Sequence, residues 1–420
     1  MKVFKFGGAS VNSIERIKNI PKILHEFAND NLVIIISAMG KTTNALEKVV
    51  DAFYEKDQLK ALQLFNKIKQ QHIDLTKEIL TTTSENCLQK LNDLFTEVEW
   101  LLHDNPVRSY DYYYDQIVSI GELLSTKIIS SYLQEHQINN TWLDVRDYIK
   151  TDNNFRNAII DWNITTDKIS SLSFDNKKSN TIYVTQGFIG ATDENESTTL
   201  GREGSDFSAA IFANILNASS LTIWKDVEGV MNADPKQFPE AVLIEELNFE
   251  EVIEMAFYGA QIIHPKTIKP LQNKKIPLYV KCFLDTNLAG TVIKDGKMKN
   301  LPPIIIIKKN QVLMNLKTKD FSFVGDKPMN YLYNLFGNLK LKPNLIQTGA
   351  INVQLCIDED ELKNEKLALE ASEIFDVEIQ KNLSLTTIRH YNQKTLKSLL
   401  SIKNILLQQQ TTETIQVLSL

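Results

Sequence analysis

A lysine beside a pair of glycines near the start of the chain has the composition of a phosphate-binding turn. The run Lys5-Phe6-Gly7-Gly8 places an ammonium next to backbone N–H groups that no Cβ shields. Such a turn can hold the phosphates of a nucleotide while the lysine neutralises the phosphoryl group in transit. Taken alone, the same residues are equally typical of an ordinary strand-to-helix turn.

Two further segments contain the small, hydroxyl and charged residues that phosphoryl transfer needs. Residues 37–44 (SAMGKTTN) directly follow an apolar run, which is where α/β sheets bind ligands. They do not form a Walker P-loop, because Ile35 stands where the first glycine is required. Residues 198–206 contain Arg202, whose guanidinium can bind a carboxylate through two hydrogen bonds. A plain helix cap would explain the Ser-Asp pair that ends this segment, but not the Gly-Arg-Glu-Gly run before it.

Other charged residues extend this candidate set. Residues 224–230 and 233–236 combine a strand end with charges and turn residues, which suits the edge of a nucleotide site, although many charged loops have this composition. Glu122 lies in the first turn of a predicted helix and can bind a substrate ammonium; its alternative role is to interact with the helix dipole. His264 precedes a proline and is interpreted as structural.

The bulk composition indicates a globular protein and excludes several classes. The 420 residues are 43% hydrophobic and 23% charged, which predicts two or more domains. A net charge of −6 argues against non-specific binding to nucleic acid or anionic membranes. Cys87, Cys282 and Cys356 are too far apart for a disulfide framework or a metal motif. No signal peptide or membrane-spanning run is visible, so we expect a cytoplasmic protein that contacts no membrane.

Apolar patterning over the first 300 residues predicts a mainly parallel sheet sandwiched by helices. The predicted strands cover residues 3–6, 32–37, 181–185 and 221–224. The predicted helical segments cover residues 13–29, 44–103 and 121–134, and residues 170–180 are predicted to be a surface loop.

After residue 301 the pattern changes to a small α+β arrangement. Strands are predicted at 304–307, 312–316, 344–347, 352–357 and 377–380, with helices at 329–339 and 361–375. A second and incomplete unit follows, with strands at 383–389 and 414–418 around a helix at 394–400.

In this order, the segments resemble the aspartate kinases of the amino-acid kinase superfamily. The motifs that carry the resemblance are KFGGAS, SAMGKTTN, DQIVSIGELLS, DVRDYIKTDNNF, TQGFIG, TTLGREGSD, IWKDVEGV, ADPK, YGAQIIHPKTI and Gly290-Thr291. The resemblance implies an α/β amino-acid kinase catalytic domain over residues 1–300. It also implies an α+β ACT-like regulatory domain over 301–381 and a second, truncated ACT-like unit over 382–420, without a fused dehydrogenase.

The resemblance further implies that ATP phosphorylates the side-chain carboxylate of L-aspartate, the first step towards lysine, threonine and methionine. By position, Lys5 stabilises the transferring phosphoryl group and Asp206 organises the catalytic centre. The substrate-binding positions are Thr43, Glu122, Arg202 and Ser205. The ATP-binding positions are Lys5, Phe6, Gly7, Gly8, Lys225, Asp226, Met231, Lys236 and Gln261. Mg²⁺ is expected to arrive on ATP, with no protein ligand assigned. No general base is needed, because the substrate carboxylate is ionised at pH 7.

The chain departs from the family pattern at four positions that bear mainly on nucleotide affinity. Ala9, Glu203, Met231 and Gln261 stand where relatives commonly have threonine, glycine, tyrosine and lysine. We expect Lys225 to replace the charge that is missing at Gln261.

The resemblance also implies an amino-acid effector at the ACT-like region and a homodimer. Residues 348–350 (TGA) lack an acidic side chain that could pair with a lysine ammonium, so we expect weak or no inhibition by lysine alone. Two alternatives stay open at this point. One is another kinase of the superfamily, acting on glutamate or acetylglutamate, and the other is a catalytically silent amino-acid sensor. The GELLS run and the ACT-like tail disfavour the first, and the retained charged residues disfavour the second.

Overall fold

The computed structural model of the protein describes residues 1–174, 180–298, 300–401 and 404–420, which form two compact units. Unit 1 consists of Met1–Val230, Leu243–Ala256 and Gln261–Met298, and unit 2 of Met231–Val242, Phe257–Ala260 and Lys299–Leu420. Met231–Val242 and Phe257–Ala260, which belong to unit 2, lie within the region 1–300 that the sequence predicts to be one domain. The predicted loop at 170–180 lies partly outside the described residues.

An eight-stranded sheet forms the centre of unit 1, in the order β10-β12-β11-β7-β1-β2-β4-β3. The β11–β12 pair is antiparallel and the other neighbours are parallel. The strands are β1 (Lys2–Phe6), β2 (Leu32–Ile36), β3 (Thr141–Trp142), β4 (Ile182–Gln186), β7 (Ser220–Lys225), β10 (Glu246–Asn248), β11 (Leu278–Cys282) and β12 (Thr291–Lys294). Every residue of β2 is buried, as its continuous apolar run predicted. The predicted strands at β1, β2, β4 and β7 are thus confirmed.

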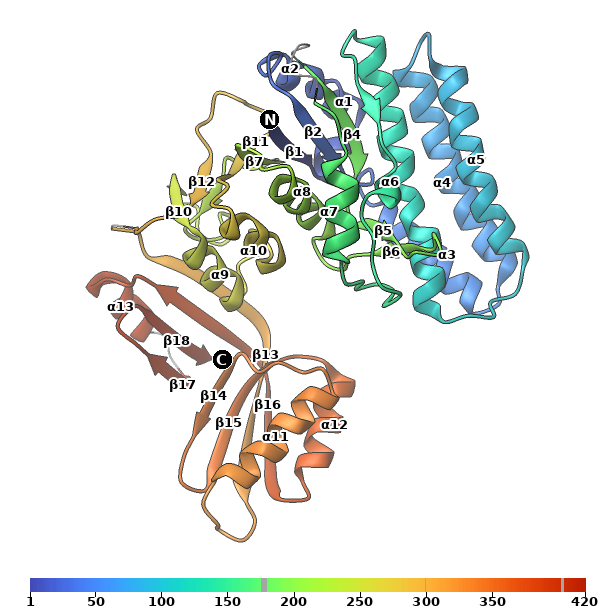
Figure 1. Ribbon diagram of the computed structural model, residues 1–420. Coiled ribbons are helices and arrows are strands. Elements are labelled where there is room, and N and C mark those ends of the chain that lie inside the picture. The colour runs from blue at the N-terminus through green and yellow to red at the C-terminus, as the bar shows by residue number, and fades with distance from the viewer. Residues whose placement is uncertain (175–179, 299, 402–403) are drawn as a thin grey trace. The chain divides into compact units, whose positions relative to one another are not determined.

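Helices cover this sheet and bring the site residues to it. They are α1 (Ile14–Ile17), α2 (Asn19–His25), α3 (Thr42–Tyr54), α4 (Gln58–Ile79), α5 (Ser84–His103), α6 (Tyr110–Glu135), α7 (Trp162–Ser170), α8 (Gly204–Ile215), α9 (Phe249–Tyr258) and α10 (Pro265–Asn273). Short elements between them are η1 (Gly8–Val11), η2 (Val145–Asp147), β5 (Ile189–Ala191), β6 (Ser197–Thr199), β8 (Val230–Met231) and β9 (Leu243–Ile244). Helices α3, α4 and α5 form the helical layer predicted over residues 44–103, and α6 lies beside α3 and α5 (Figure 1). None of the helices described has the length and apolar character needed to cross a membrane.

Two helix predictions for unit 1 were wrong in their limits. The predicted helix 13–29 is two short helices, because Pro21 has no N–H with which to continue the hydrogen-bond ladder. Helix α6 starts at Tyr110, well before residue 121. Ser109 caps it, because its side chain accepts a hydrogen bond from the Tyr112 N–H. Glu122 therefore lies inside a long helix and not in a first turn, so interaction with a helix N-terminus does not explain it.

Unit 2 is built on a six-stranded sheet in the order β14-β15-β13-β16-β18-β17. Its strands are β13 (Ile304–Thr318), β14 (Leu345–Thr348), β15 (Asn352–Asp358), β16 (Phe375–Arg389), β17 (Ile405–Gln410) and β18 (Thr414–Ser419). Its helices are α11 (Asp326–Asn338), α12 (Glu361–Ala371) and α13 (Gln393–Leu400). These orange and red elements of Figure 1 include each strand and helix predicted after residue 301, together with β17, which the glutamine-rich sequence did not reveal.

Four strands predicted as separate are in fact two continuous ones. Strand β13 joins 304–307 to 312–316, and β16 joins 377–380 to 383–389. Their ladder changes register near residue 311, and both Asn310 and Asn382 have a positive φ, so bulges absorb the polar residues that suggested loops. The predicted limit between residues 381 and 382 consequently falls inside β16.

Candidate active site

The centre of the site is an ion pair between a strand and a helix of unit 1. Along β1 the side chains alternate, so Phe4 and Phe6 pack on the aromatic core around Trp224 while Lys5 points to the opposite face. Helix α8 packs against this strand, and Asp206 stands in its first turn. The Lys5 Nζ lies 2.7 Å from the Asp206 Oδ1, with side chains only 12% and 6% exposed.

Glycines allow the close approach of backbone segments around this pair. A Cβ on Gly187 would lie 2.7 Å from the Cα of Ser205, so only glycine lets the end of β4 meet the start of α8. A Cβ on Gly8 would lie 2.8 Å from the carbonyl oxygen of Ala38, where the turn after β1 meets the turn after β2. The predicted phosphate-binding turn is therefore packed tightly against the SAMGKTTN segment.

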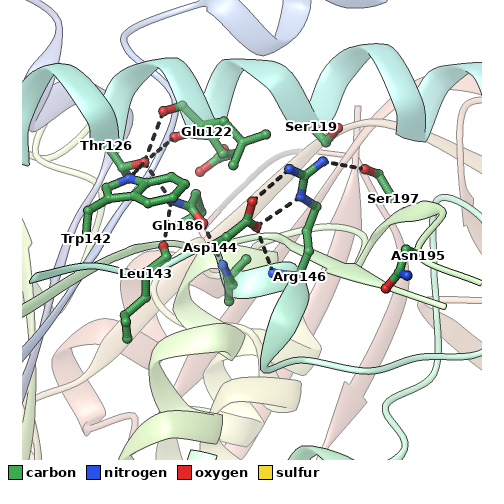
Figure 2. Close-up of polar contacts among 12 residues, drawn as sticks. Ser119, Glu122, Thr126, Trp142, Leu143, Asp144, Arg146, Gln186, Asn195 and Ser197 are labelled. Atoms are coloured by element: carbon green, nitrogen blue, oxygen red, sulfur yellow. Dashed lines mark hydrogen bonds and ion pairs between the residues drawn. The ribbon is translucent and has the colours of Figure 1, made fainter. Parts of the chain in front are cut away.

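Glu122 reaches the same place from α6, which is anchored one turn later. The Thr126 Oγ1 accepts hydrogen bonds from the Trp142 Nε1 at 3.0 Å and from the Gln186 Nε2 at 2.7 Å (Figure 2). Gln186 also donates to the carbonyl oxygen of Leu143 at 3.1 Å, so the helix, β4 and the segment after β3 are tied together beside Glu122.

Glu122 has the electrostatics of a carboxyl group that awaits a cation. It is 3% exposed, and its Oε2 has no hydrogen-bond partner among the described residues. Burial raises the pKa of this carboxyl to about 8, although the N–H groups of Ala38 and Gly187 and the charge of Lys5 act in the opposite direction. A ligand ammonium placed beside Glu122 would stabilise its ionised form.

These side chains line a cavity of about 450 Å³ in unit 1. Its walls are formed by Lys5, Gly8, Ser37, Ala38, Gly40, Thr43, Tyr114, Glu122, Arg156, Phe188, Thr199, Gly201, Arg202, Glu203, Gly204, Ser205 and Asp206. Both predicted catalytic residues and all predicted substrate-binding residues are therefore brought together from distant parts of the sequence. We call Lys5, Glu122 and Asp206 the buried group, and Arg156, Arg202 and Glu203 the rim, since Arg156 and Arg202 are exposed and Glu203 is half-buried.

Three non-glycine residues of the cavity wall have a left-handed backbone. The φ angles are 65° at Arg156, 70° at Phe188 and 55° at Glu203. Such conformations are unfavourable for residues with a Cβ and persist where the surroundings enforce them, commonly at functional sites. At Glu203, where the family resemblance predicts glycine, the Oε2 accepts a hydrogen bond of 2.7 Å from the His264 N–H. His264 thus has the structural role that the sequence suggested, and its side chain also caps α10.

The other predicted ATP-binding residues do not line this cavity. The Phe6 ring is fully buried in the core, which leaves only its backbone for a ligand, and Gly7 lies beside the Lys5 Nζ. The Lys225 Nζ donates to the carbonyl oxygen of Ile262 at 2.6 Å, next to the exposed Gln261. Asp226 pairs with Arg16 at 3.6 Å, and Met231 and Lys236 belong to unit 2.

Sequence reasoning gave no role to several residues of the cavity wall. Tyr114, Arg156, Phe188 and Thr199 were not singled out, although they lie within or beside the quoted motifs. Their spacing carries no periodic signal, and only their convergence in space identifies them. Asp115, which is fully buried behind the wall, was missed for the same reason.

The structure offers no ready-made protein cage for a metal. Among the described residues, no group of three or more histidine, cysteine, aspartate or glutamate side chains could hold an ion. Asp206 is a cavity carboxylate already paired with Lys5.

Comparison with known proteins decides the family. The model of the amino acid kinase family matches residues 1–282. The chain is also 30% identical over 388 residues to aspartokinase 2, chloroplastic, of Arabidopsis thaliana, covering 89% of this chain and 69% of the relative. The chain belongs to the aspartokinases of the amino acid kinase family. Lysine-sensitive aspartokinase 3 of Escherichia coli is another relative, 29% identical over 401 residues, with 92% of this chain and 86% of that protein covered.

A solved aspartokinase has the same fold. The structure of Escherichia coli aspartokinase III in complex with lysine and aspartate, in the T-state, superposes with a TM-score of 0.81 at 25% identity, covering 100% of this chain and 95% of that one. The predicted amino-acid kinase fold with ACT-like C-terminal domains is thereby confirmed. The predicted enzyme class, an ATP-dependent aspartate kinase, is that of this aspartokinase family.

Proposed function

We propose that the cavity of unit 1 is where this aspartokinase transfers the γ-phosphoryl group of ATP to the side-chain carboxylate of L-aspartate, forming 4-phospho-L-aspartate. The observation that carries the assignment is the convergence of the buried group, an ammonium and two carboxyl groups from different elements, in one cavity with Arg202. A cavity of about 450 Å³ is of the size that holds a small ligand.

In the proposed reaction an aspartate carboxylate oxygen attacks the γ-phosphorus. A new O–P bond forms as the bond to the β–γ bridging oxygen breaks, and ADP leaves with the electron pair. No proton has to move, because the nucleophile is already ionised. Catalysis then consists of positioning and of stabilising the charge on the phosphoryl oxygens. Lys5 is the residue proposed for that stabilisation, and Asp206 holds its ammonium in place.

The substrate is proposed to be recognised by its charged groups. Glu122, with an oxygen that lacks a partner within the described part of the chain, binds the ammonium of aspartate. Arg202 binds the α-carboxylate. Thr43, in the first turn of α3, and Ser205, in the first turn of α8, supply hydroxyl groups to the same cavity.

The nucleotide is proposed to extend from the Gly7-Gly8 turn towards Lys225, Asp226 and Gln261 of unit 1. The roles of Met231 and Lys236 stay predictions from the sequence. Lys225 is held beside Gln261 through the carbonyl oxygen of Ile262, which supports its predicted role as a replacement for a missing lysine. We propose that Mg²⁺ arrives on ATP, where it would shield the phosphate charge during transfer.

Regulation and assembly are proposed by analogy with the relatives. We propose that unit 2 pairs with its copy in a homodimer and binds an amino-acid effector. The relative from Escherichia coli is named lysine-sensitive, whereas residues 348–350 of this chain have no acidic side chain, so lysine alone should inhibit weakly. A cytoplasmic location stays a prediction.

A hydroxamate assay tests the proposed function directly. Hydroxylamine traps an acyl phosphate, so the assay is run with ATP, Mg²⁺ and, separately, aspartate, glutamate and acetylglutamate. Of the three acceptors, we expect only aspartate to give product, and the Asp206→Asn variant should lose most of this activity. Equal rates with glutamate, or no product with any of the three, would refute the assignment. Adding lysine at about 1 mM to the aspartate reaction checks the expected weak inhibition.

A further inference from the structure

Arg156 is held in an unfavourable backbone conformation by a buried carboxyl group. Its φ of 65° is left-handed, which is unfavourable for a residue with a Cβ. The Asp115 Oδ2 accepts a hydrogen bond from the Arg156 N–H at 3.0 Å and another from the Thr199 N–H at 2.8 Å. The Oδ1 accepts a third from the Thr199 hydroxyl at 2.7 Å. Asp115 is fully buried and stands on α6, the helix that carries Glu122, so the wall of the cavity is fixed to the helix of the buried group.

The guanidinium of Arg156 is positioned over an aromatic wall but is only weakly paired. Its central carbon lies 4.3 Å from the centre of the Tyr114 ring, and both side chains line the cavity. The ion pairs with Glu47 and Asp111 are long, at 3.4 and 3.5 Å, and the arginine side chain is 41% exposed. Exposed pairs of this kind contribute little, so a ligand carboxylate can replace them at small cost.

The charges of the cavity leave a place for this guanidinium in substrate binding. Lys5 is paired with Asp206, and the Glu203 carboxylate is bonded to the His264 N–H. Glu122 is proposed for the substrate ammonium. The two arginines of the rim, which both line the cavity, are then available for the charged group of aspartate that remains, its α-carboxylate. Two guanidinium groups can share a carboxylate, because its two oxygens accept about four hydrogen bonds.

We propose that Arg156 is a substrate-recognition residue that exchanges Glu47 and Asp111 for the α-carboxylate of aspartate and binds it together with Arg202. The inference rests on the proposed function and adds a specificity residue to it. It predicts that Glu47 and Asp111 compete with the substrate for the same guanidinium. A purely structural arginine would not respond to this competition.

The first test compares Arg156→Gln with a matched control, Arg108→Gln. Arg108 also stacks on a tyrosine, with its guanidinium carbon 3.7 Å from the centre of the Tyr112 ring, and pairs with Glu196, but it does not line the cavity. We expect Arg156→Gln to raise the KM for aspartate about 10- to 100-fold, the size of a lost charge-assisted hydrogen bond. The kcat and the KM for ATP should change less than about threefold, and Arg108→Gln should leave all three unchanged. Arg156→Lys, which keeps the charge without the fork, should be intermediate and also guards against a failure of the glutamine variant to fold.

The second test is a cycle with the competing carboxylates. The double variant Glu47→Gln with Asp111→Asn should lower the KM for aspartate several-fold in the parent protein and should have no effect when Arg156→Gln is present. An unchanged KM in Arg156→Gln, or a fall in kcat alone, would overturn the inference; the latter would place Arg156 on the phosphoryl group. An active parent enzyme with either result refutes this inference alone, whereas a parent without aspartate-dependent turnover refutes the proposed function as well.

Discussion

The buried group and the rim of the cavity are built in different ways. Lys5, Glu122 and Asp206 come from a strand and two helices whose hydrogen bonds and apolar contacts fix them before any ligand arrives. Arg156, Arg202 and Glu203 come from turns, and two of them have a left-handed backbone. Helices and strands fix the position of a charged side chain precisely, which a buried charge requires. Turns present exposed side chains, which can exchange one partner for another. We therefore expect the chemical step to depend on Lys5 and Asp206 of the buried group, and substrate affinity to depend on Glu122 together with the rim.

The largest effect should come from Lys5→Ala. Removing one preorganised charge from a transferring phosphoryl group typically lowers the rate about 100- to 1000-fold. Because the packing of β1 rests on its apolar residues, the melting temperature should change little. Steady-state kinetics and thermal unfolding check both points. A loss of less than tenfold in kcat would show that Lys5 is not the residue that stabilises the phosphoryl group.

Arg202→Lys should mainly raise the KM for aspartate, since lysine keeps the charge but loses the two-pronged contact. We expect a rise of roughly tenfold with kcat nearly preserved. If only the KM for ATP changed, Arg202 would belong to the nucleotide site, and the rim would not be a substrate-binding surface.

Within the buried group, Glu122 should make the KM for aspartate depend on pH. The pKa of Glu122 is raised to about 8 by burial, so its carboxyl group is mostly protonated below that pH and cannot pair with the aspartate ammonium. The KM for aspartate should therefore fall as the pH is raised from 6.5 to 8.5, by up to about tenfold per unit. The variant Glu122→Gln should have a high KM that does not vary with pH.

The same group gives a stability test with a defined sign. Between its usual value near 4.5 and its folded value near 8, the native state binds more protons at Glu122 than the unfolded chain does. The free energy of unfolding should thus decline as the pH rises through this range, and Glu122→Gln should reduce the decline. Urea unfolding at pH 6 and pH 8.5 measures this decline in the free energy of unfolding. An equal decline in the parent protein and in Glu122→Gln would contradict the raised pKa.

The smallest effects are expected at Glu203. Replacement by glycine relieves the left-handed backbone, a gain of about 1 kcal/mol, but removes the hydrogen bond to the His264 N–H, which contributes about as much. Replacement by alanine loses the bond and keeps the strain. Glu203→Ala should therefore be less stable than Glu203→Gly by about 1 kcal/mol in chemical unfolding. Equal stabilities would show that the turn does not strain this residue.

Local sequence determined the buried group almost completely. Strand β2 and the alternation in β1 follow from apolar patterning, and the motifs around Lys5, Glu122 and Asp206 identified the residues of the buried group and the family. Patterning failed where long-range pairing overrides local polarity. Strands β13 and β16 continue through polar residues because they pair with each other over most of their length. Bulges absorb the change of register near residue 311.

The tertiary structure alone decided the part of the cavity wall around Arg156. Nothing in the spacing of Asp115, Arg156 and Thr199 indicates that one buried carboxyl group holds the other two, because these residues are far apart in sequence and follow no helical or strand period. Their arrangement depends on where α6 crosses the end of the sheet. A sequence motif reports the residues of one local segment. A cavity wall made of turns depends on how several elements pack together, which no single segment specifies.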